Sequence, residues 1–287
     1  MISPPVGSFS PPSSAPAGWY PDPYGGGFAR YYDGYQWTPY VAPSANLREA
    51  APQEAPPHPE LPISFAIGAI VILAASLIAS RELLDALIDH DWNIVVYMAI
   101  AVAVGYGPSI VWMWFASRRW GTGHVLSDLG VRFRWVDLGW GPLIWIGTVA
   151  AMGVAVGLMR LLDVPYRGNL DVDNGSPFER DNTSIVALLV SAVVFAPIVE
   201  EALFRGAVLR GLLSKMVAVW AIAIQAVLFG AAHFDPDFGR ESIGLIIALS
   251  VAGDGFGLAS YLLRRLGPVM IAHAVMNAVA ITVVLNS

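Results

Sequence analysis

The sequence contains no cysteine and few charged residues. Without cysteine the chain can form neither disulfide bonds nor thiolate zinc sites. Charged residues make up 13% of the 287 positions and hydrophobic residues 56%, whereas soluble domains carry about 25% charged residues. The net charge of −6 argues against a nucleic-acid partner, because such proteins present basic surfaces. This composition predicts an integral membrane protein.

Other absences narrow the class of function. The sequence lacks HExxH, the compact zinc signature of metalloproteases, and GxSxG, the nucleophile motif of serine hydrolases. It shows no internal repeat, which disfavours a transporter built from inverted repeats. The first apolar stretch begins only after Leu61, so we expect no N-terminal signal peptide. The first membrane helix would then insert the chain in the inner (plasma) membrane.

Residues 1–60 differ in composition from the rest, with fourteen of the 21 prolines at or before Pro62. Such a segment predicts a mostly disordered tail. An aromatic-rich stretch with turn signals, GWYPDPYGGGFARYYDGYQWT at 18–38, instead favours a small β module. It resembles a short module of unknown function that actinobacterial membrane proteins often carry at their N-termini. The alternative interpretation is a disordered, aromatic-rich tail.

From Leu61 onward the sequence predicts a helical bundle, since a membrane-spanning helix needs about 20 apolar residues. We expect about seven spans, at 61–80, 93–116, 138–160, 184–203, 217–233, 242–263 and 267–286. Lys and Arg follow the second, fourth and sixth spans, whereas the other connections are acidic or mixed. The positive-inside rule then predicts a cytoplasmic N-terminus and an external C-terminus.

Two adjacent carboxylates, Glu200 and Glu201, end the fourth span. Charged side chains are costly inside a membrane, and there they usually mark function. Glu201 and Arg205 are four residues apart and share a helix face, whereas Glu200 points about 100° away. The spacing therefore favours a structural pair of Glu201 with Arg205 and a chemical role for Glu200.

Two later histidines can reach Glu200 if the helices pack as a hairpin. Glu200 and His233 each lie about 25 Å from a turn near Lys215, at 1.5 Å per helical residue. His273 and Asn277 share one face of the last helix, about 9 Å and 15 Å from Gly267. We expect the four side chains to converge in a cavity within the cytoplasmic half of the bilayer.

These residue types suit amide hydrolysis. A desolvated carboxylate can take a proton from water, and a neighbouring histidine can relay that proton. A second histidine and an asparagine can donate hydrogen bonds to the oxyanion. The set Glu200, His233 and His273 could instead hold a divalent metal such as zinc, with Glu201 or Asn277 as a further oxygen ligand. The residues leave both mechanisms open.

Three motifs occur in order on successive membrane segments: EExxxR from Glu200 to Arg205, FxxxH from Phe229 to His233, and HxxxN from His273 to Asn277. In this order they resemble the CPBP family, which comprises CAAX proteases and bacteriocin-processing enzymes, is also called ABI, and includes the type II CAAX prenyl endopeptidase. The resemblance extends from about Val125 to residue 287. It implies an all-α polytopic membrane protein with a conical catalytic cavity in residues 61–287.

The resemblance also implies an intramembrane endopeptidase that cleaves a peptide or membrane-protein substrate near the cytoplasmic side of the bilayer. Family members have been described both as metalloproteases and as metal-independent glutamate proteases, so a metal cofactor is either absent or a divalent ion. The roles carried over are water activation by Glu200 and His233, an oxyanion hole from His273 and Asn277, and support from Glu201, Arg205 and Phe229.

Two other functions remain as alternatives. The first is a non-catalytic membrane protein of the same fold that acts as an immunity factor or scaffold. The second is a proton-coupled transporter that uses Glu200, the histidines and Asp254. Asp254 lies among glycines in SVAGDGFG and has no counterpart in the family motifs. We expect it to line the polar cavity or to mark a helix break.

Overall fold

The computed structural model describes residues 18–33, 36–43, 61–90, 92–168 and 181–286. The chain divides into two compact units, residues 1–59 and residues 60–287. Most of the predicted disordered tail lies outside the described residues.

The N-terminal unit contains the predicted β module. Strands β1 (Gly18–Pro21), β2 (Phe28–Tyr32) and β3 (Trp37–Pro43) form an antiparallel sheet in the order β1-β2-β3. The loop between β1 and β2 contains three consecutive glycines at 25–27 with positive φ angles, a conformation that only glycine adopts readily. The expectation of a small aromatic β module is therefore confirmed.

Aromatic rings cover both faces of this sheet. Tyr31 and Tyr32 are adjacent on β2 and point to opposite faces, yet both are buried. Tyr31 packs edge-on against Trp19, with ring centroids 5.5 Å apart. Tyr32 packs against Tyr20 at 6.2 Å and Trp37 at 5.3 Å. The dense aromatic spacing of the sequence thus supplies the module with two small clusters instead of a single core.

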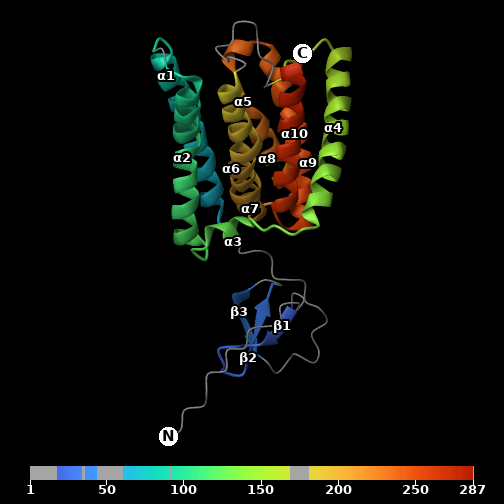
Figure 1. Cartoon of the computed structure of the whole chain (residues 1–287). Coiled ribbons are helices and arrows are strands. Elements are labelled where there is room, and N and C mark those ends of the chain that lie inside the picture. The colour runs from blue at the N-terminus through green and yellow to red at the C-terminus, as the bar shows by residue number, and fades with distance from the viewer. Residues whose placement is uncertain (1–17, 34–35, 44–60, 91, 169–180, 287) are drawn as a thin grey trace. The chain divides into compact units, whose positions relative to one another are not determined.

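The C-terminal unit is a helical bundle (Figure 1). Its elements are α1 (Ile63–Leu87), α2 (Ile94–Trp120), α3 (Val125–Leu129), α4 (Asp137–Leu161), α5 (Asn182–Leu189), η2 (Val190–Phe195), α6 (Ala196–Glu201), η3 (Ala202–Val208), α7 (Leu209–Leu213), α8 (Ala218–Ala231), η4 (Pro236–Phe238), α9 (Glu241–Leu263) and α10 (Gly267–Asn286). Elements α5 to α7 follow one another without a break and form one long helix over 182–213.

Within the described residues, six helices are long and apolar enough to cross a membrane: α1, α2, α4, the 182–213 helix, α9 and α10. The protein is therefore a multi-pass membrane protein. The difference from the seven expected spans lies at 217–233, where α8 has only 14 residues. It stops at Ala231 because Asp235 and Pro236 begin the short turn η4 soon afterwards. At about 21 Å, α8 is shorter than the roughly 30 Å hydrocarbon core.

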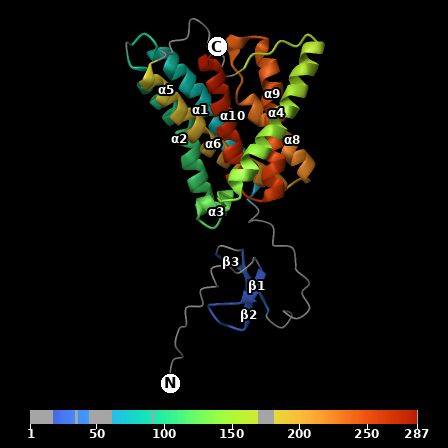
Figure 2. The ribbon, with the colours of Figure 1, turned by 45° about the vertical axis from the view of Figure 1, so that its right-hand side comes forward.

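The helices pack as pairs around the 182–213 helix. Helix α1 packs along α2, α8 along α9, and α4 along both α9 and α10 (Figure 2). Buried apolar side chains from α1, η3, α8 and α9 form the main core, including Phe65, Leu203, Phe204, Phe229 and Leu245. The two glutamates of the 182–213 helix thus lie inside the bundle instead of facing lipid.

A connecting segment closes one end of the bundle. After α3 the backbone carbonyls of Gly130 and Arg132 accept hydrogen bonds from the amides of Leu266 and Gly267, at 3.0 and 3.1 Å. Asp137, fully buried at the start of α4, accepts from Arg265 at 2.6 Å. These contacts fix the start of α10, and with it the depth of His273.

Candidate active site

Two wide helical turns flank the glutamate pair. Segments η2 and η3 are π-helical, and α6, which carries Glu200 and Glu201, lies between them. Pro197 lacks a backbone N–H and its ring clashes with the preceding turn, which accounts for the widening at η2. Such π-helical insertions are frequent at functional sites. The sequence-based geometry assumed a regular α-helix and did not foresee them.

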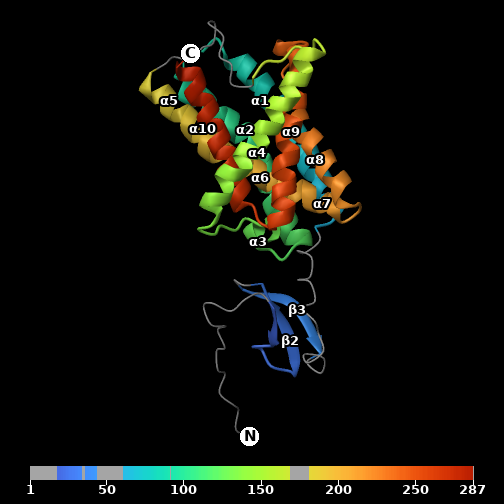
Figure 3. The same ribbon diagram turned by 90° about the vertical axis from the view of Figure 1, so that its right-hand side faces the viewer.

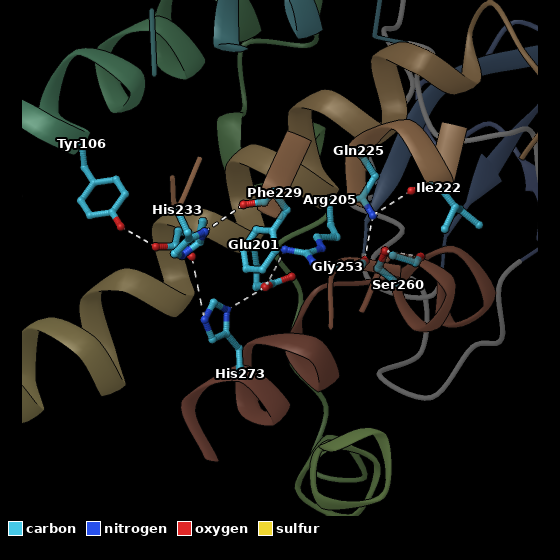
Figure 4. A network of polar contacts seen from close by, with 12 residues as sticks. Tyr106, Glu201, Arg205, Ile222, Gln225, Phe229, His233, Gly253, Ser260 and His273 are labelled. Carbon is cyan, nitrogen blue, oxygen red and sulfur yellow. Dashed lines mark hydrogen bonds and ion pairs between the residues drawn. The ribbon is translucent and has the colours of Figure 1, made fainter. Parts of the chain in front are cut away.

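Glu201 is completely buried and has two partners. Its Oε1 accepts a hydrogen bond from Arg205 Nη1 at 3.0 Å, so the pair forms as the spacing predicts. The same oxygen lies 2.9 Å from His273 Nδ1, on α10. Arg205 Nη2 also donates to the carbonyl of Gly253 at 3.2 Å. Glu201 therefore joins the 182–213 helix to α9, through Arg205, and to α10 (Figure 4).

Glu200 is also buried but is held differently. Its Oε1 accepts a hydrogen bond from the hydroxyl of Tyr106, on α2. Its Oε2 is buried without a hydrogen-bond partner among the described residues. The nearest histidine nitrogen, His273 Nε2, is 3.8 Å from Oε2, which is too far for a direct hydrogen bond. One oxygen of Glu200 is thus oriented by a phenol while the other is unengaged.

His233 lies just beyond the end of α8, half-buried. Its Nδ1 is 2.8 Å from the carbonyl oxygen of Phe229. Because a carbonyl can only accept, Nδ1 carries the hydrogen in this contact, and Nε2 of the neutral ring is left as an acceptor. The Phe229 ring lies 4.9 Å from the His233 ring and 5.9 Å from the His273 ring. Phe229 therefore contacts both histidines. Of the four side chains expected to converge, Glu200 and His273 lie 3.8 Å apart.

Asn277 lies four residues after His273 on α10. Its side-chain Nδ2 donates to the carbonyl of Ala192 in η2 at 2.7 Å. A π-helical turn leaves such carbonyls available to outside donors. The amide retains a second N–H and its oxygen for other contacts. Asn277 is thus anchored to the irregular segment that precedes the glutamates.

Tyr106 is the site residue that the sequence did not reveal. It lies in the middle of α2 and has no motif spacing to Glu200. It also lines a groove between α1 and α2, together with Leu77, Ser80, Arg81, Leu84, Asp85, Ala101, Val102 and Gly105. Arg81 pairs with Asp235 at 3.3 Å and Asp237 at 2.8 Å. These ion pairs fix the turn that follows His233.

The side chains do not form a metal centre in this arrangement. Within the described part of the chain, no group of three or more His, Asp or Glu side chains could hold a metal ion. A divalent metal held by Glu200, His233 and His273 therefore stays a prediction.

Asp254 behaves differently from both expectations. Helix α9 runs unbroken from Glu241 to Leu263, so Asp254 does not mark a helix break. Its side chain is exposed, whereas Ala252, Gly253 and Phe256 beside it are buried, so it does not line the polar site. The glycines do not interrupt the helix, because neighbouring helices pack against them and support the backbone there.

The arrangement can perform acid–base chemistry in a water-poor environment. It offers a buried carboxylate with one free oxygen, a histidine with a free nitrogen, and a carboxylate–histidine pair. Comparison with protein-family models matched residues 182–279 to the family described as type II CAAX prenyl endopeptidase Rce1-like. Residues 17–58 matched DUF2510, a family of unknown function.

The first match covers α5 to α10, which hold all of the predicted site residues, and is shorter than the region from Val125 that we expected. No curated protein and no solved structure matched the chain. Membership of the Rce1-like family implies a CAAX-type intramembrane protease. Residues 182–279 are therefore identified as an Rce1-like CAAX prenyl endopeptidase (CPBP) domain, and the chain also carries an N-terminal DUF2510 module.

Proposed function

We propose that the protein is an intramembrane endopeptidase in which Glu200 activates the attacking water. The observation that carries this proposal is the buried, unpartnered Oε2 of Glu200 beside an oxygen fixed by Tyr106. Oε2 of Glu201 is also buried without a hydrogen-bond partner, but Glu201 is already paired with Arg205 and His273 through Oε1. A buried carboxylate oxygen without a donor favours a role in proton transfer. The water would lie against Oε2, lose a proton to it, and add to the carbonyl carbon of the scissile peptide bond.

The histidines divide the remaining tasks. His233 holds its Nδ1–H on the carbonyl of Phe229, which directs Nε2 for proton acceptance. Glu200 Oε2 would hand the proton taken from water to Nε2 of His233, and His233 would deliver it to the nitrogen of the leaving amine as the C–N bond breaks. His273 bonds Glu201 through Nδ1, and this carboxylate would stabilise a protonated ring whose Nε2–H points toward Glu200 and the oxyanion. Arg205 neutralises Glu201 from the other side.

Asn277 would supply the second hydrogen bond to the oxyanion. One N–H of its amide is fixed on Ala192, which leaves the other N–H in a defined direction. This arrangement agrees with preorganised donors, which stabilise the transition state without reorganising during the reaction.

The cytoplasmic side is the proposed location of cleavage. His273 lies six residues, or about 9 Å, from the start of α10. That end of the bundle carries Arg118, Arg119, Arg132, Arg134, Arg210, Lys215, Arg264 and Arg265. Since Lys and Arg are enriched in cytoplasmic loops, this end would face the cytoplasm. The peptide substrate would then be cut within the inner half of the membrane.

A comparison of membrane proteomes tests the proposal. Cells that express wild type, Glu200→Gln or His233→Ala are compared for new protein N-termini, at matched levels of inserted enzyme. We expect one or more N-termini that occur only with wild type, with the uncut precursor accumulating in both variants. The same set of N-termini in all three strains would contradict it. A control variant, Glu82→Gln, removes an exposed carboxylate outside the site and should match wild type.

A further inference from the structure

Asp254 is a charged residue in the middle of a membrane-crossing helix. It lies 13 residues after the start of α9 and nine before its end, or about 20 Å and 14 Å along the helix axis. Its side chain is exposed, and it makes no hydrogen bond or ion pair with any described residue. Ionisable residues at such a depth are rare and almost always face a protein interior, a water-filled cavity or a partner.

The packing of α9 shows which way Asp254 points. A methyl group on Gly253 would lie 2.9 Å from Ala226 of α8, and one on Gly255 would lie 2.7 Å from Thr148 of α4. Helices α8 and α4 therefore flank α9 closely on the two sides of Asp254. Residues Leu245, Leu249, Ala252 and Phe256, on the opposite face of α9, are buried. Because successive residues differ by 100°, Asp254 points directly away from the bundle interior.

The surface around Asp254 is an apolar ridge, which we call the α9 ridge. Its other members are Ile243, Ile247, Leu258 and Tyr261, all exposed and on the same helix face. Figure 3 shows α9 at the surface of the bundle, between α4 and α8. Asp254 is the one acidic member of this ridge, and it lies at mid-depth. The ridge would suit lipid well if Asp254 were a leucine.

We infer that the α9 ridge docks a membrane-spanning helix of a partner protein that carries a basic side chain at mid-depth. The apolar members would pack along such a helix, and Asp254 would pair with the cation. Charge complementarity argues for this occupant. A carboxylate and a cation each lose hydration in the membrane, and their contact offsets part of that free-energy cost. The proposal is independent of the peptidase site, since Asp254 faces away from that network.

Energy transfer in vesicles tests the proposal with a defined probe. The chain has no cysteine, so Leu162→Cys at the exposed end of α4 gives a single donor label on the full-length protein. The probes are two acceptor-labelled helical peptides of leucine and alanine, one with a central lysine and one with a central leucine. Protein and peptide are reconstituted in phosphatidylcholine vesicles, which carry no net charge.

We expect wild type to bind the lysine peptide about three- to twentyfold more tightly than the leucine peptide, the range typical of polar contacts between membrane helices. Asp254→Asn should lose this preference and Asp254→Glu should retain it. The control Asp89→Asn, which removes an exposed loop carboxylate, should behave as wild type.

Results of two kinds would overturn the proposal. One is equal binding of the two peptides to wild type, or a lysine preference that survives in Asp254→Asn. The other is energy transfer between two differently labelled copies of the chain that disappears in Asp254→Asn, because the ridge would then be a contact between copies. Asp254→Asn keeps the side-chain size and a polar group at an exposed position, so a folded protein is expected for the comparison.

Discussion

At the scale of single residues, the adjacent glutamates have different surroundings. Glu201 is bound by a cation and a histidine, and Glu200 by a phenol. Two carboxylates so close together would repel if neither were compensated. Arg205 and His273 compensate Glu201, so the pair does not act as a symmetric acid dyad. The free oxygen of Glu200 is what the proposed chemistry uses.

Tyr106 provides a test of how Glu200 is oriented. Tyr106→Phe keeps the ring and removes the hydroxyl that donates to Glu200 Oε1. Hydrogen bonds to charged groups contribute about 1.5–3 kcal/mol, so we expect kcat to fall by roughly 10- to 100-fold with little change in KM. Tyr97→Phe in the same helix is the matched control, because the Tyr97 hydroxyl donates to the backbone carbonyls of Leu87 and His90, which precede α2. Equal kcat values for wild type and Tyr106→Phe would contradict this role.

The sequence predicted some of these residues and not others for a physical reason. The Glu201–Arg205 pair is local, and helical spacing alone places the two side chains together. Glu200, His233 and His273 could be predicted because ionisable side chains in apolar segments are costly and usually functional. Tyr106 could not be selected, since a tyrosine in a membrane helix is ordinary and only the packing of α2 brings it to Glu200. The Glu201–His273 contact likewise depends on how α10 packs.

At the scale of elements, the π-helical segments η2 and η3 flank the turn that carries the two glutamates. The length of the apolar run correctly predicted a helix here, but that length cannot reveal an extra residue in a turn. Segment η2 presents the Ala192 carbonyl to Asn277 and so links α10 to the glutamate-bearing helix. The same limit explains α8, where an apolar run long enough for a span is cut short by the turn at Pro236.

Asn277→Ala tests this link and the oxyanion role together. Loss of an oxyanion donor typically lowers turnover by about 10²–10³-fold. We expect that loss in kcat, measured on a substrate identified from the proteome comparison, and also a lower melting temperature because the bond to Ala192 is removed. Full turnover in a folded Asn277→Ala protein would exclude the oxyanion role.

The ion pair of Asp137 in α4 with Arg265 in the α9–α10 turn, which we call the clamp, should carry much of the stability at its end of the bundle. Asp137 is fully buried and binds Arg265. Removing one partner of a buried ion pair leaves the other charge uncompensated, at about 3–5 kcal/mol. We therefore expect Asp137→Asn to unfold at a clearly lower temperature in detergent. The exposed Asp163→Asn serves as the control, and equal melting temperatures for the two variants would refute the clamp.

At the scale of the whole molecule, the chain combines a membrane bundle with a separate small sheet. Composition predicted both parts, because proline and aromatic residues concentrate before Pro62 and apolar residues after it. Six long helices rather than seven is the main difference in the bundle. The arrangement of the helices could not be predicted from the sequence. Most membrane helices here show apolar residues on every side, so no face marks which neighbour it packs against.

The two units should respond separately to acid. The hydrogen bond from Arg30 lowers the pKa of Asp22 in the sheet, and the Arg30 Nε to Asp22 Oδ1 distance is 2.9 Å. A lowered folded-state pKa means that the stabilisation is complete above the unfolded value of about 3.9 and is lost as pH falls through the folded value. We expect hydrogen-exchange protection of β1 and β2 in the full chain to fall below about pH 4, after correction for intrinsic exchange rates.

Asp22→Asn should remove that pH dependence and lower the protection of β1 and β2 at neutral pH. The melting temperature of the bundle should stay unchanged, because each unit is compact by itself. A bundle that melts earlier in Asp22→Asn, or a sheet whose protection keeps its dependence on acid, would contradict this view of the module.

The central claim is that Glu200 is the base for peptide hydrolysis, and the most direct measurement is the cleavage rate of a reconstituted enzyme. Wild type, Glu200→Gln and Glu82→Gln are placed in vesicles with the precursor that accumulates in Glu200→Gln cells, and cleavage is followed by mass spectrometry. We expect cleavage by wild type and Glu82→Gln and none by Glu200→Gln, although all three insert and melt alike. Cleavage by Glu200→Gln at the wild-type rate would contradict it.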